Sequence, residues 1–120
     1  MRRLALLISA TALVPATASA APRDSYCSPS GDYCTSIKRD GDDAILRIGA
    51  FAFDGRYRLC VTSPRGARSC KGFGLRADVA GIFGSRVRWS RHFPGGGPGL
   101  YRVAWRKFGN RLGPRLAFRR

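Results

Sequence analysis

Short stretches in which every second residue is apolar recur along this chain, and the residues between them are rich in Gly, Pro and Asp. Clear examples are residues 56–62 (RYRLCVT) and 100–106 (LYRVAWR). Alternation of this period, broken at intervals of roughly 8–12 residues, is typical of strands in all-β domains. The strong helix formers Glu and Gln are absent. The sequence therefore predicts an all-β fold of the sandwich or barrel type.

The alternating stretches place about seven strands in residues 33–120. These strands are expected at residues 33–39, 44–53, 56–62, 68–75, 85–93, 100–106 and 111–118. The apolar alternation slips near Gly49, which indicates a β-bulge, and Pro114 indicates that the last strand lies at a sheet edge. The side chains expected to form the core are Leu46, Ile48, Leu59, Val61, Trp89, Tyr101, Val103, Trp105, Leu116 and Phe118.

Residues 1–20 (MRRLALLISATALVPATASA) have the features of a secretory signal peptide: two arginines, an apolar run and a small-residue end at Ala18-Ser19-Ala20. A retained anchor helix is the alternative, but the apolar run is short for a bilayer. The expected organisation is therefore a signal peptide at 1–20, a stapled N-terminal loop at 21–32 and a β domain at 33–120, with the mature chain secreted and without a membrane span.

Four cysteines lie beyond the leader, and an exported chain usually pairs an even set of cysteines. The spacing of CSPSGDYC, residues 27–34, suits neither a zinc site nor a C-x-x-C redox pair. We therefore expect the disulfides Cys27–Cys34 and Cys60–Cys70, the second closing a hairpin with Gly66 in the left-handed conformation and Tyr57 opposite Phe73. Each staple should stabilise the fold by roughly 2–3 kcal/mol.

Residues 99–105 (GLYRVAW) resemble a core strand of fibronectin type III and related immunoglobulin-like domains, in which a corner tyrosine opens the strand. The resemblance implies an antiparallel β-sandwich, with Tyr101 as the corner residue. The first, second and fifth strands would then form one sheet, and the third, fourth, sixth and seventh the other. Two features depart from the family: no cysteine pair can cross between the sheets, and Asp54-Gly55 favours a tight hairpin at a place where the family changes sheet.

The residues give little support to catalysis. His92 is the only histidine, and it shares a strand face with Ser90 in the expected strand, but no nucleophile elbow frames Ser90. The residues 40–43 (DGDD) suit a hairpin turn better than a calcium loop, and the glycine turn at 94–99 lacks the Lys-Ser/Thr of a phosphate loop, which favours a flexible connector. We expect no enzyme activity, no cofactor and no metal.

The charge of the chain is strongly positive. Its 22 Lys and Arg against 7 Asp give a net charge of +15, and loss of a leader that holds two arginines would leave +13. Such a field attracts polyanions. In the sandwich arrangement the outer face of one sheet would carry Arg56, Arg58, Arg102, Arg106, Arg115 and Arg119, extended by Arg65, Arg68 and Lys71.

The expected function is therefore that of a secreted, non-catalytic interaction module that binds an anionic polymer through this Arg-rich face. The partner would be an anionic cell-wall polymer, a polysaccharide or an acidic protein. Nucleic acid would be bound through its phosphates, without sequence readout. The aromatic residues of these strands are expected to face the core, which argues against a base-stacking platform for a single strand. A solvated face with an Arg excess set by composition is the competing interpretation. The functional alternatives are a cationic effector that acts on membranes and a small secreted hydrolase that uses His92.

Overall fold

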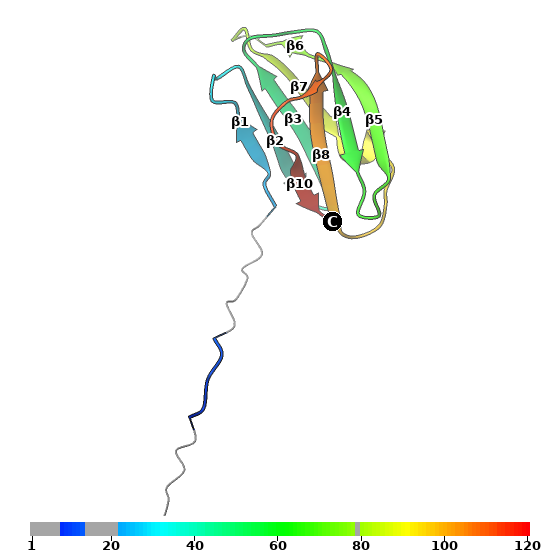
Figure 1. Cartoon of the computed structure of the whole chain (residues 1–120). Coiled ribbons are helices and arrows are strands. Elements are labelled where there is room, and N and C mark those ends of the chain that lie inside the picture. The colour runs from blue at the N-terminus through cyan, green and yellow to red at the C-terminus, as the bar shows by residue number, and fades with distance from the viewer. Residues whose placement is uncertain (1–7, 14–21, 79) are drawn as a thin grey trace, which may run out of the picture.

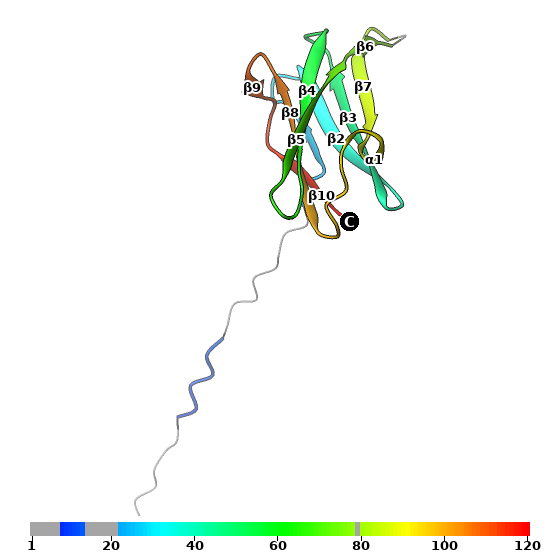
Figure 2. The same ribbon diagram turned by 90° about the vertical axis from the view of Figure 1, so that its right-hand side faces the viewer.

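In a computed structural model the chain forms two antiparallel β-sheets that pack face to face (Figures 1 and 2). The structure describes residues 8–13, 22–78 and 80–120, and most of the expected signal peptide lies outside them. The first sheet has the order β1 (Ser25–Cys27), β2 (Tyr33–Asp40), β3 (Asp43–Ala50), β7 (Phe83–Arg88) and β6 (Arg76–Ala77). The second has the order β10 (Leu116–Arg119), β8 (Leu100–Lys107), β4 (Arg56–Thr62) and β5 (Arg68–Gly74), and β9 (Asn110–Arg111) pairs with β8.

Most of the predicted strands are confirmed. Those at 33–39, 56–62, 68–75 and 100–106 match β2, β4, β5 and β8 to within one residue at either end. The strands are divided between the two sheets as the sandwich arrangement requires, and β10 lies at a sheet edge. β1 and β6 are short edge strands that the sequence pattern did not predict.

Two predicted strands end earlier than expected. The strand at 44–53 ends at Ala50, and β3 pairs without interruption with β2 and β7, so the predicted bulge is wrong. The slip in alternation instead marks the end of the strand, after which Phe51 is 55% exposed. The strand at 85–93 ends at Arg88 and is followed by one helical turn, α1 (Trp89–His92). A carboxylate oxygen of Asp43 accepts the Ser90 N–H at 3.1 Å and fixes the start of this turn.

The last predicted strand, 111–118, is divided into β9 and β10. The interruption is caused by Gly113, whose φ of +69° does not belong to a strand, and by Pro114, which has no N–H to donate. Arg111 consequently pairs with Arg106 in a hairpin on β8, while Leu116 pairs with Val103 further along the same strand.

One cluster of buried side chains, drawn from both sheets, fills the space between them. All ten residues predicted for the core are buried, with exposed fractions of 4% or less. The core also takes in Tyr57 and Val87, which the same alternation directs inward, and residues that were not predicted: Ile37, Ala44, Ala50, Leu75 and Phe93. Most of the core comes from β3, β4, β8 and β10, so the alternate residues of these strands face outward.

Both expected disulfides are present, and each joins residues that face one another on adjacent strands. Cys27–Cys34 ties β1 to β2, and Cys60–Cys70 ties β4 to β5. The predicted register of the second hairpin is also confirmed, because Tyr57 lies opposite Phe73 and Gly66 has a φ of +90°.

The glycine turn at 94–99 connects α1 to β8, as predicted, and two of its residues are bonded to the protein. The hydroxyl of Tyr101 donates to the carbonyl of Gly97 at 2.6 Å and accepts the N–H of Gly96 at 2.8 Å. A Cβ on Gly96 would lie 2.7 Å from the Cβ of Ser63, so the turn approaches the β4–β5 turn too closely for a larger residue. Tyr101 is fully buried and holds this connection to the start of its own strand.

Candidate functional site: an arginine face on one sheet

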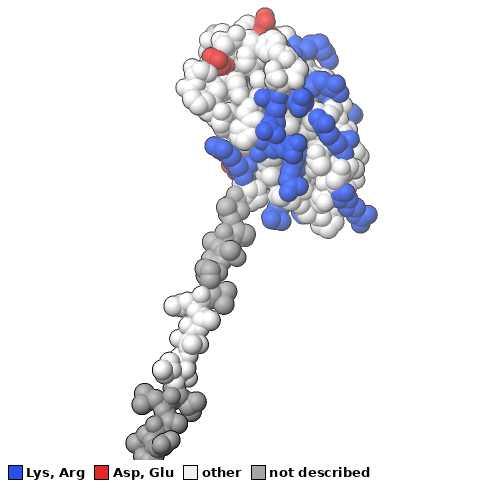
Figure 3. Space-filling view, viewed as in Figure 1, with Lys and Arg blue, Asp and Glu red and all other residues white. Residues whose placement is uncertain are grey.

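The outward face of the sheet β10-β8-β4-β5 carries a concentration of arginines. Since alternate residues of a strand point to opposite sides, the residues between the core positions of β4 and β8 face solvent. The six predicted residues all lie on this side: Arg56 and Arg58 on β4, Arg102 and Arg106 on β8, Arg119 on β10, and Arg115 just before it. Figure 3 shows Lys and Arg side chains spread over this sheet, while the few Asp atoms in view lie at its margins.

The strand register decides which further cationic residues belong to this face. Arg68 lies opposite Thr62, which confirms its predicted place beside the face, and Arg111 lies opposite Arg106. Lys71 lies opposite the core residue Leu59, so it points to the other side of β5, where its ammonium group is 6.0 Å from the ring centre of Phe93. We use the name arginine face for the set Arg56, Arg58, Arg68, Arg102, Arg106, Arg111, Arg115 and Arg119.

Like charges on this face are placed directly opposite one another. Arg58 faces Arg106 across β4 and β8, and Arg106 faces Arg111 across β8 and β9. Like charges in this arrangement destabilise a sheet by a few tenths of a kcal/mol to about 1 kcal/mol per pair. Within residues 22–78 and 80–120 the ion pairs are those of Arg88 with Asp40 and Asp43, on the other sheet. The arginine face therefore keeps its charge without neutralisation from the described protein.

The distribution of acids explains this charge. The chain has 7 acidic residues, all Asp, and none of them lies on β4, β5, β8, β9 or β10. They are at Asp24, Asp32, Asp40, Asp42, Asp43, Asp54 and Asp78, before β1, on β2 and β3, and in connections. A cationic surface of this kind attracts anions from solution, and guanidinium groups bind phosphate and carboxylate through paired hydrogen bonds.

The surface of the arginine face is hollowed around its disulfide. A depression of about 370 Å³ lies over Cys60–Cys70 and is lined by Arg58, Arg68 and Arg106. A smaller one of about 20 Å³ follows beside Ala104, where Arg102, Arg111 and Arg115 contribute to the lining. The outward residues of these strands include no aromatic side chain, but the exposed ring of Phe108, in the β8–β9 connection, lines a further depression of about 380 Å³ together with Arg56, Arg58 and Arg106.

The outward face of the other sheet carries a smaller cationic group. Arg47 lies opposite Arg86 across β3 and β7, which repeats the cross-strand arrangement of Arg58 and Arg106. Arg88 next to them is neutralised, since its guanidinium lies 2.9 Å from Asp40 and 3.2 Å from Asp43. The pair Arg47 and Arg86 is thus a natural reference for the arginine face.

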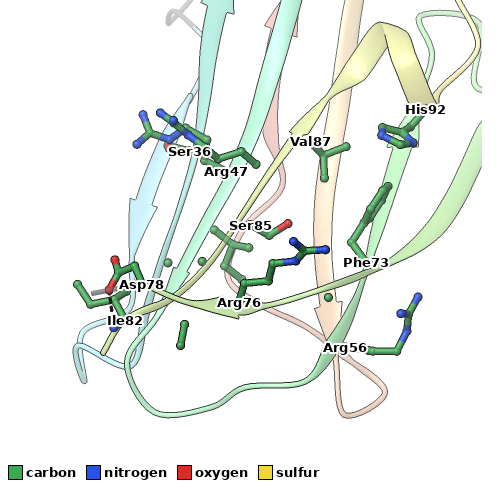
Figure 4. A pocket seen from close by; sticks show the side chains of 16 residues that line it. Ser36, Arg47, Arg56, Phe73, Arg76, Asp78, Ile82, Ser85, Val87 and His92 are labelled. Carbon is green, nitrogen blue, oxygen red and sulfur yellow. Dashed lines mark hydrogen bonds between the residues drawn. The ribbon is translucent and has the colours of Figure 1, made fainter. Parts of the chain in front are cut away.

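A second, wider depression of about 990 Å³ runs along the β7–β6 edge toward β5 (Figure 4). His92 lies there with its ring centre 5.1 Å from that of Phe73, and Figure 4 shows Arg76 extended toward Ser85 and Phe73. The buried hydroxyl of Tyr57 donates to Ser85 at 2.8 Å, and burial raises the pKa of Tyr57 although this hydrogen bond opposes the shift.

The structure separates the two residues that the sequence placed on one strand face. Ser90 and His92 lie on the turn of α1 rather than on a strand, so that expectation is wrong. The Ser90 hydroxyl donates to the carboxylate of Asp43, whereas His92 packs on Phe73. The arrangement uses Ser90 to anchor α1 to β3.

The acidic turn between β2 and β3 is built as a hairpin, as predicted. Gly41 has a φ of +60° and Asp40 faces Asp43 at the ends of the two strands. Burial acts to raise the pKa of Asp43, but hydrogen bonds from Ser90, the Ala44 N–H and Arg88 outweigh it and lower the pKa to about 2.

This depressed pKa predicts a loss of stability in acid. The folded carboxyl binds its proton near pH 2 and the unfolded one near 3.8, so the stabilisation is complete above about pH 5 and is lost as the pH falls through 2. Asp43→Asn should lower the free energy of unfolding by about 1–2 kcal/mol at pH 7. Urea unfolding of both proteins from pH 7 to pH 2 measures this, and a difference that stays constant down to pH 2 would contradict it.

Comparison with protein-family models, with curated proteins and with solved structures finds no match to this chain. In the part of the chain that the structure describes, no helix is long and apolar enough to cross a membrane. No group of three or more His, Cys or Asp side chains in that part is close enough to hold a metal ion.

Proposed function

We propose that this chain is a secreted, non-catalytic interaction module that binds an anionic polymer through the arginine face. The observation that carries the proposal is the placement of arginines directly opposite one another on a sheet that bears no acid. The repulsion between them lowers stability in the free protein. Binding of a polyanion would relieve that repulsion and use every guanidinium that the sheet presents.

The proposed fold type is an immunoglobulin-like β-sandwich. The division of the strands into β2-β3-β7 and β10-β8-β4-β5 supports it. So does the hydroxyl of Tyr101, which bonds back to the backbone of Gly96 and Gly97 as a corner tyrosine does. A fold of this type has no function of its own, and the function is argued from the arginine face.

Export is supported by the leader pattern and by the disulfides. Residues 1–20 have the charge, apolar run and small-residue end of a signal peptide. All four cysteines beyond them are paired, which is compatible with an oxidising, extracellular location. The chain would then meet the polymers of a cell surface or of the medium rather than those of the cytosol.

Retention on immobilised polymers over a salt series tests the proposal. The probes are an anionic wall polymer, DNA and a heparin-like polysaccharide. The variant Arg102→Gln/Arg106→Gln removes two charges from the arginine face, and Arg47→Gln/Arg86→Gln removes two charges from the other sheet. Both double variants lower the net charge by two. A difference in affinity between them therefore distinguishes binding at the arginine face from attraction by the net charge of the protein.

We expect the double at 102 and 106 to lose at least about tenfold in affinity at physiological salt and to show a shallower dependence on salt. The double at 47 and 86 should lose less than about threefold. Equal losses in the two doubles would mean that only total charge matters and would overturn the proposal.

A second candidate function, that of a cationic effector acting on membranes, is favoured by one observation. Phe51 and Phe108 are 55% and 74% exposed in the β3–β4 and β8–β9 connections. Phe108 has a φ of +56°, which a bulky residue rarely adopts, and Lys107 lies 4.8 Å from its ring centre. Leakage of anionic vesicles that Phe108→Ala abolishes would support this candidate, and intact vesicles would leave polymer binding as the function.

A further inference from the structure

The centre of the arginine face is a row of small side chains that runs across three strands. Cys70 of β5, Cys60 of β4 and Ala104 of β8 are register partners in sequence, so they lie side by side. Cys60 and Cys70 are joined by their disulfide and Ala104 is only 7% exposed, so none of the three projects far from the sheet. The row is the floor of the depressions described above, and we call it the trough.

Arginines form both walls of the trough. Arg58 lies two positions before Cys60 on β4, and its partner Arg106 lies two positions after Ala104 on β8. The β8–β9 hairpin places Arg111 beside Arg106, so these three arginines form the first wall. On the other side of the floor, Arg68 lies two positions before Cys70 on β5, and Arg102 lies two positions before Ala104 on β8. These two arginines form the second wall. Because the walls are four residues apart along each strand, their Cα atoms are separated by about 13 Å. The side chains can lean inward from both walls over the floor.

A glycine lets one further arginine reach the first wall. The guanidinium of Arg56 lies over Gly72, with a nitrogen 3.2 Å from the position that a Cβ would occupy there. Gly72 lies opposite Arg58, so Arg56 continues the wall of Arg58 and Arg106 across β5. The trough therefore has cations along its length, at intervals set by the strand spacing of about 4.8 Å.

This shape fits one linear chain and excludes a duplex. The major groove of a DNA duplex is itself about 12 Å wide, so the whole duplex is wider than the space between the walls. The Arg68 guanidinium lies 3.5 Å from the Sγ of Cys60, and only about 20 Å³ is open beside Ala104. A single polymer chain would therefore lie above this floor, on the guanidinium groups that lean over it, with cations on both sides. The chain would run across the strands, along the row from β5 to β8.

The chemistry of the walls favours phosphodiesters. A phosphodiester presents two non-bridging oxygens that share one negative charge and diverge from the chain, so guanidinium groups can approach it from both walls. The carboxylate of an acidic sugar directs both oxygens to one side. Sugar rings also need acceptors for their hydroxyls or aromatic faces, and the outward residues of these strands include no acid. The exposed ring of Phe108 lines the depression beside Arg56, Arg58 and Arg106, not the depressions over Cys60 and Ala104.

We propose that the trough binds a single chain of phosphodiesters, with the Cys60–Cys70 disulfide as its floor. This inference rests on the proposed function and names the class of polymer that the arginine face takes. A polyol-phosphate polymer of a cell wall and the backbone of a single-stranded nucleic acid share this chemistry, and the experiment distinguishes them.

The test is a binding titration by fluorescence anisotropy at one fixed salt concentration. The probes are poly(glycerol phosphate), an abasic deoxyribose-phosphate oligomer, a single-stranded oligonucleotide and a duplex of matched phosphate count. The key variant is Ala104→Phe, which fills the floor and keeps every arginine. Ala77→Phe, an exposed position on β6 of the other sheet, is the matched control. Gly72→Val is a second variant, expected to displace the Arg56 guanidinium.

We expect the three single chains to bind more tightly than the duplex. Ala104→Phe should weaken the single chains at least about tenfold and change duplex binding less than about twofold, while Gly72→Val should weaken the single chains severalfold. Circular dichroism and the absence of free thiols check that each variant is folded. Equal affinity for the abasic and base-bearing oligomers would show that the backbone alone is bound, and preference for poly(glycerol phosphate) would indicate a wall polymer.

Two results separate the trough from the arginine face as a whole. Suppose that Ala104→Phe and Gly72→Val bind the single chains normally while Arg102→Gln/Arg106→Gln binds them weakly. The proposal that the trough is the binding site is then wrong, and the proposal that the arginine face binds an anionic polymer stands. If the double variant binds every probe normally, the proposed function fails and the trough fails with it. Tighter binding of the duplex than of the single chains would also overturn the trough.

Discussion

Gly113→Ala should lower the free energy of unfolding by about 2–4 kcal/mol. Gly113 has a φ of +69°, which costs a residue with a side chain about 1–2 kcal/mol. A Cβ at this position would also lie 2.5 and 2.6 Å from two ring carbons of Tyr26, and such overpacking costs about 1–3 kcal/mol. Gly113 joins β9 to β10, and its carbonyl accepts the Arg111 guanidinium at 2.9 Å, so the same change should displace Arg111 on the arginine face.

Gly109→Ala is the matched control for this prediction. Gly109 has a similar φ of +75°, but nothing lies within 4 Å of the position of its Cβ. Gly109→Ala should therefore lower the free energy of unfolding by only about 1–2 kcal/mol, which is the cost of the backbone conformation alone. Urea unfolding of the two variants measures the difference, and equal losses would show that the contact with Tyr26 is not a constraint.

Trp105→Ala should cost about 3–5 kcal/mol, which is a large part of the stability of a domain of this size. Trp105 is fully buried on β8, between the outward residues Ala104 and Arg106. Removing its ring leaves a cavity directly beneath the strand that carries the centre of the arginine face. We therefore expect the variant to unfold at a much lower urea concentration and to bind polymer only where it remains folded.

Phe108→Ala provides the comparison, since it also removes an aromatic ring but from a side chain that is 74% exposed. Its free energy of unfolding should change by no more than about 0.5 kcal/mol. Unfolding followed by tryptophan fluorescence is unsuitable for Trp105→Ala, so circular dichroism should follow both variants. A small loss for Trp105→Ala would mean that the core closes over the cavity.

The sequence was most informative where one local rule decides the structure. The alternation in residues 56–62 and 100–106 determines which side chains face the core, because the side-chain period of a strand is two. The paired cysteines Cys60 and Cys70 then fix the register between β4 and β5. Core and outward residues of these strands could therefore both be predicted without knowledge of the rest of the fold.

The errors arose where distant residues decide the structure. Val87 and Trp89 continue the strand pattern, but the chain turns into α1 because Asp43, far earlier in the sequence, accepts the Ser90 N–H. No local pattern contains this contact. The division of the last strand, in contrast, follows from the local residues Gly113 and Pro114, which the alternation of apolar residues did not take into account.

The same distinction applies to the arginine face. Side-chain parity placed Arg58, Arg102 and Arg106 on one side of the sheet, which the register confirms. Arg111 has the parity of Arg115 and Arg119 in the expected strand 111–118, so the same rule could have placed it on this side, and the hairpin at 108–109 sets it opposite Arg106. The trough could not be predicted, since it depends on which residues of three strands lie side by side, with Ala104 level with the disulfide.

The pairing of the cysteines has a consequence for how the chain matures. Both disulfides join cysteines that are consecutive in the sequence, Cys27 with Cys34 and Cys60 with Cys70. In an exported chain that emerges N-terminus first, Cys34 is the next cysteine to emerge after Cys27, and Cys70 is the next after Cys60. Each native partner is therefore the first cysteine that becomes available. Of the three pairings that four cysteines allow, an oxidase acting in order of emergence makes the native one. If the chain is exported as proposed, thiol–disulfide rearrangement is unnecessary and its maturation would not require a disulfide isomerase.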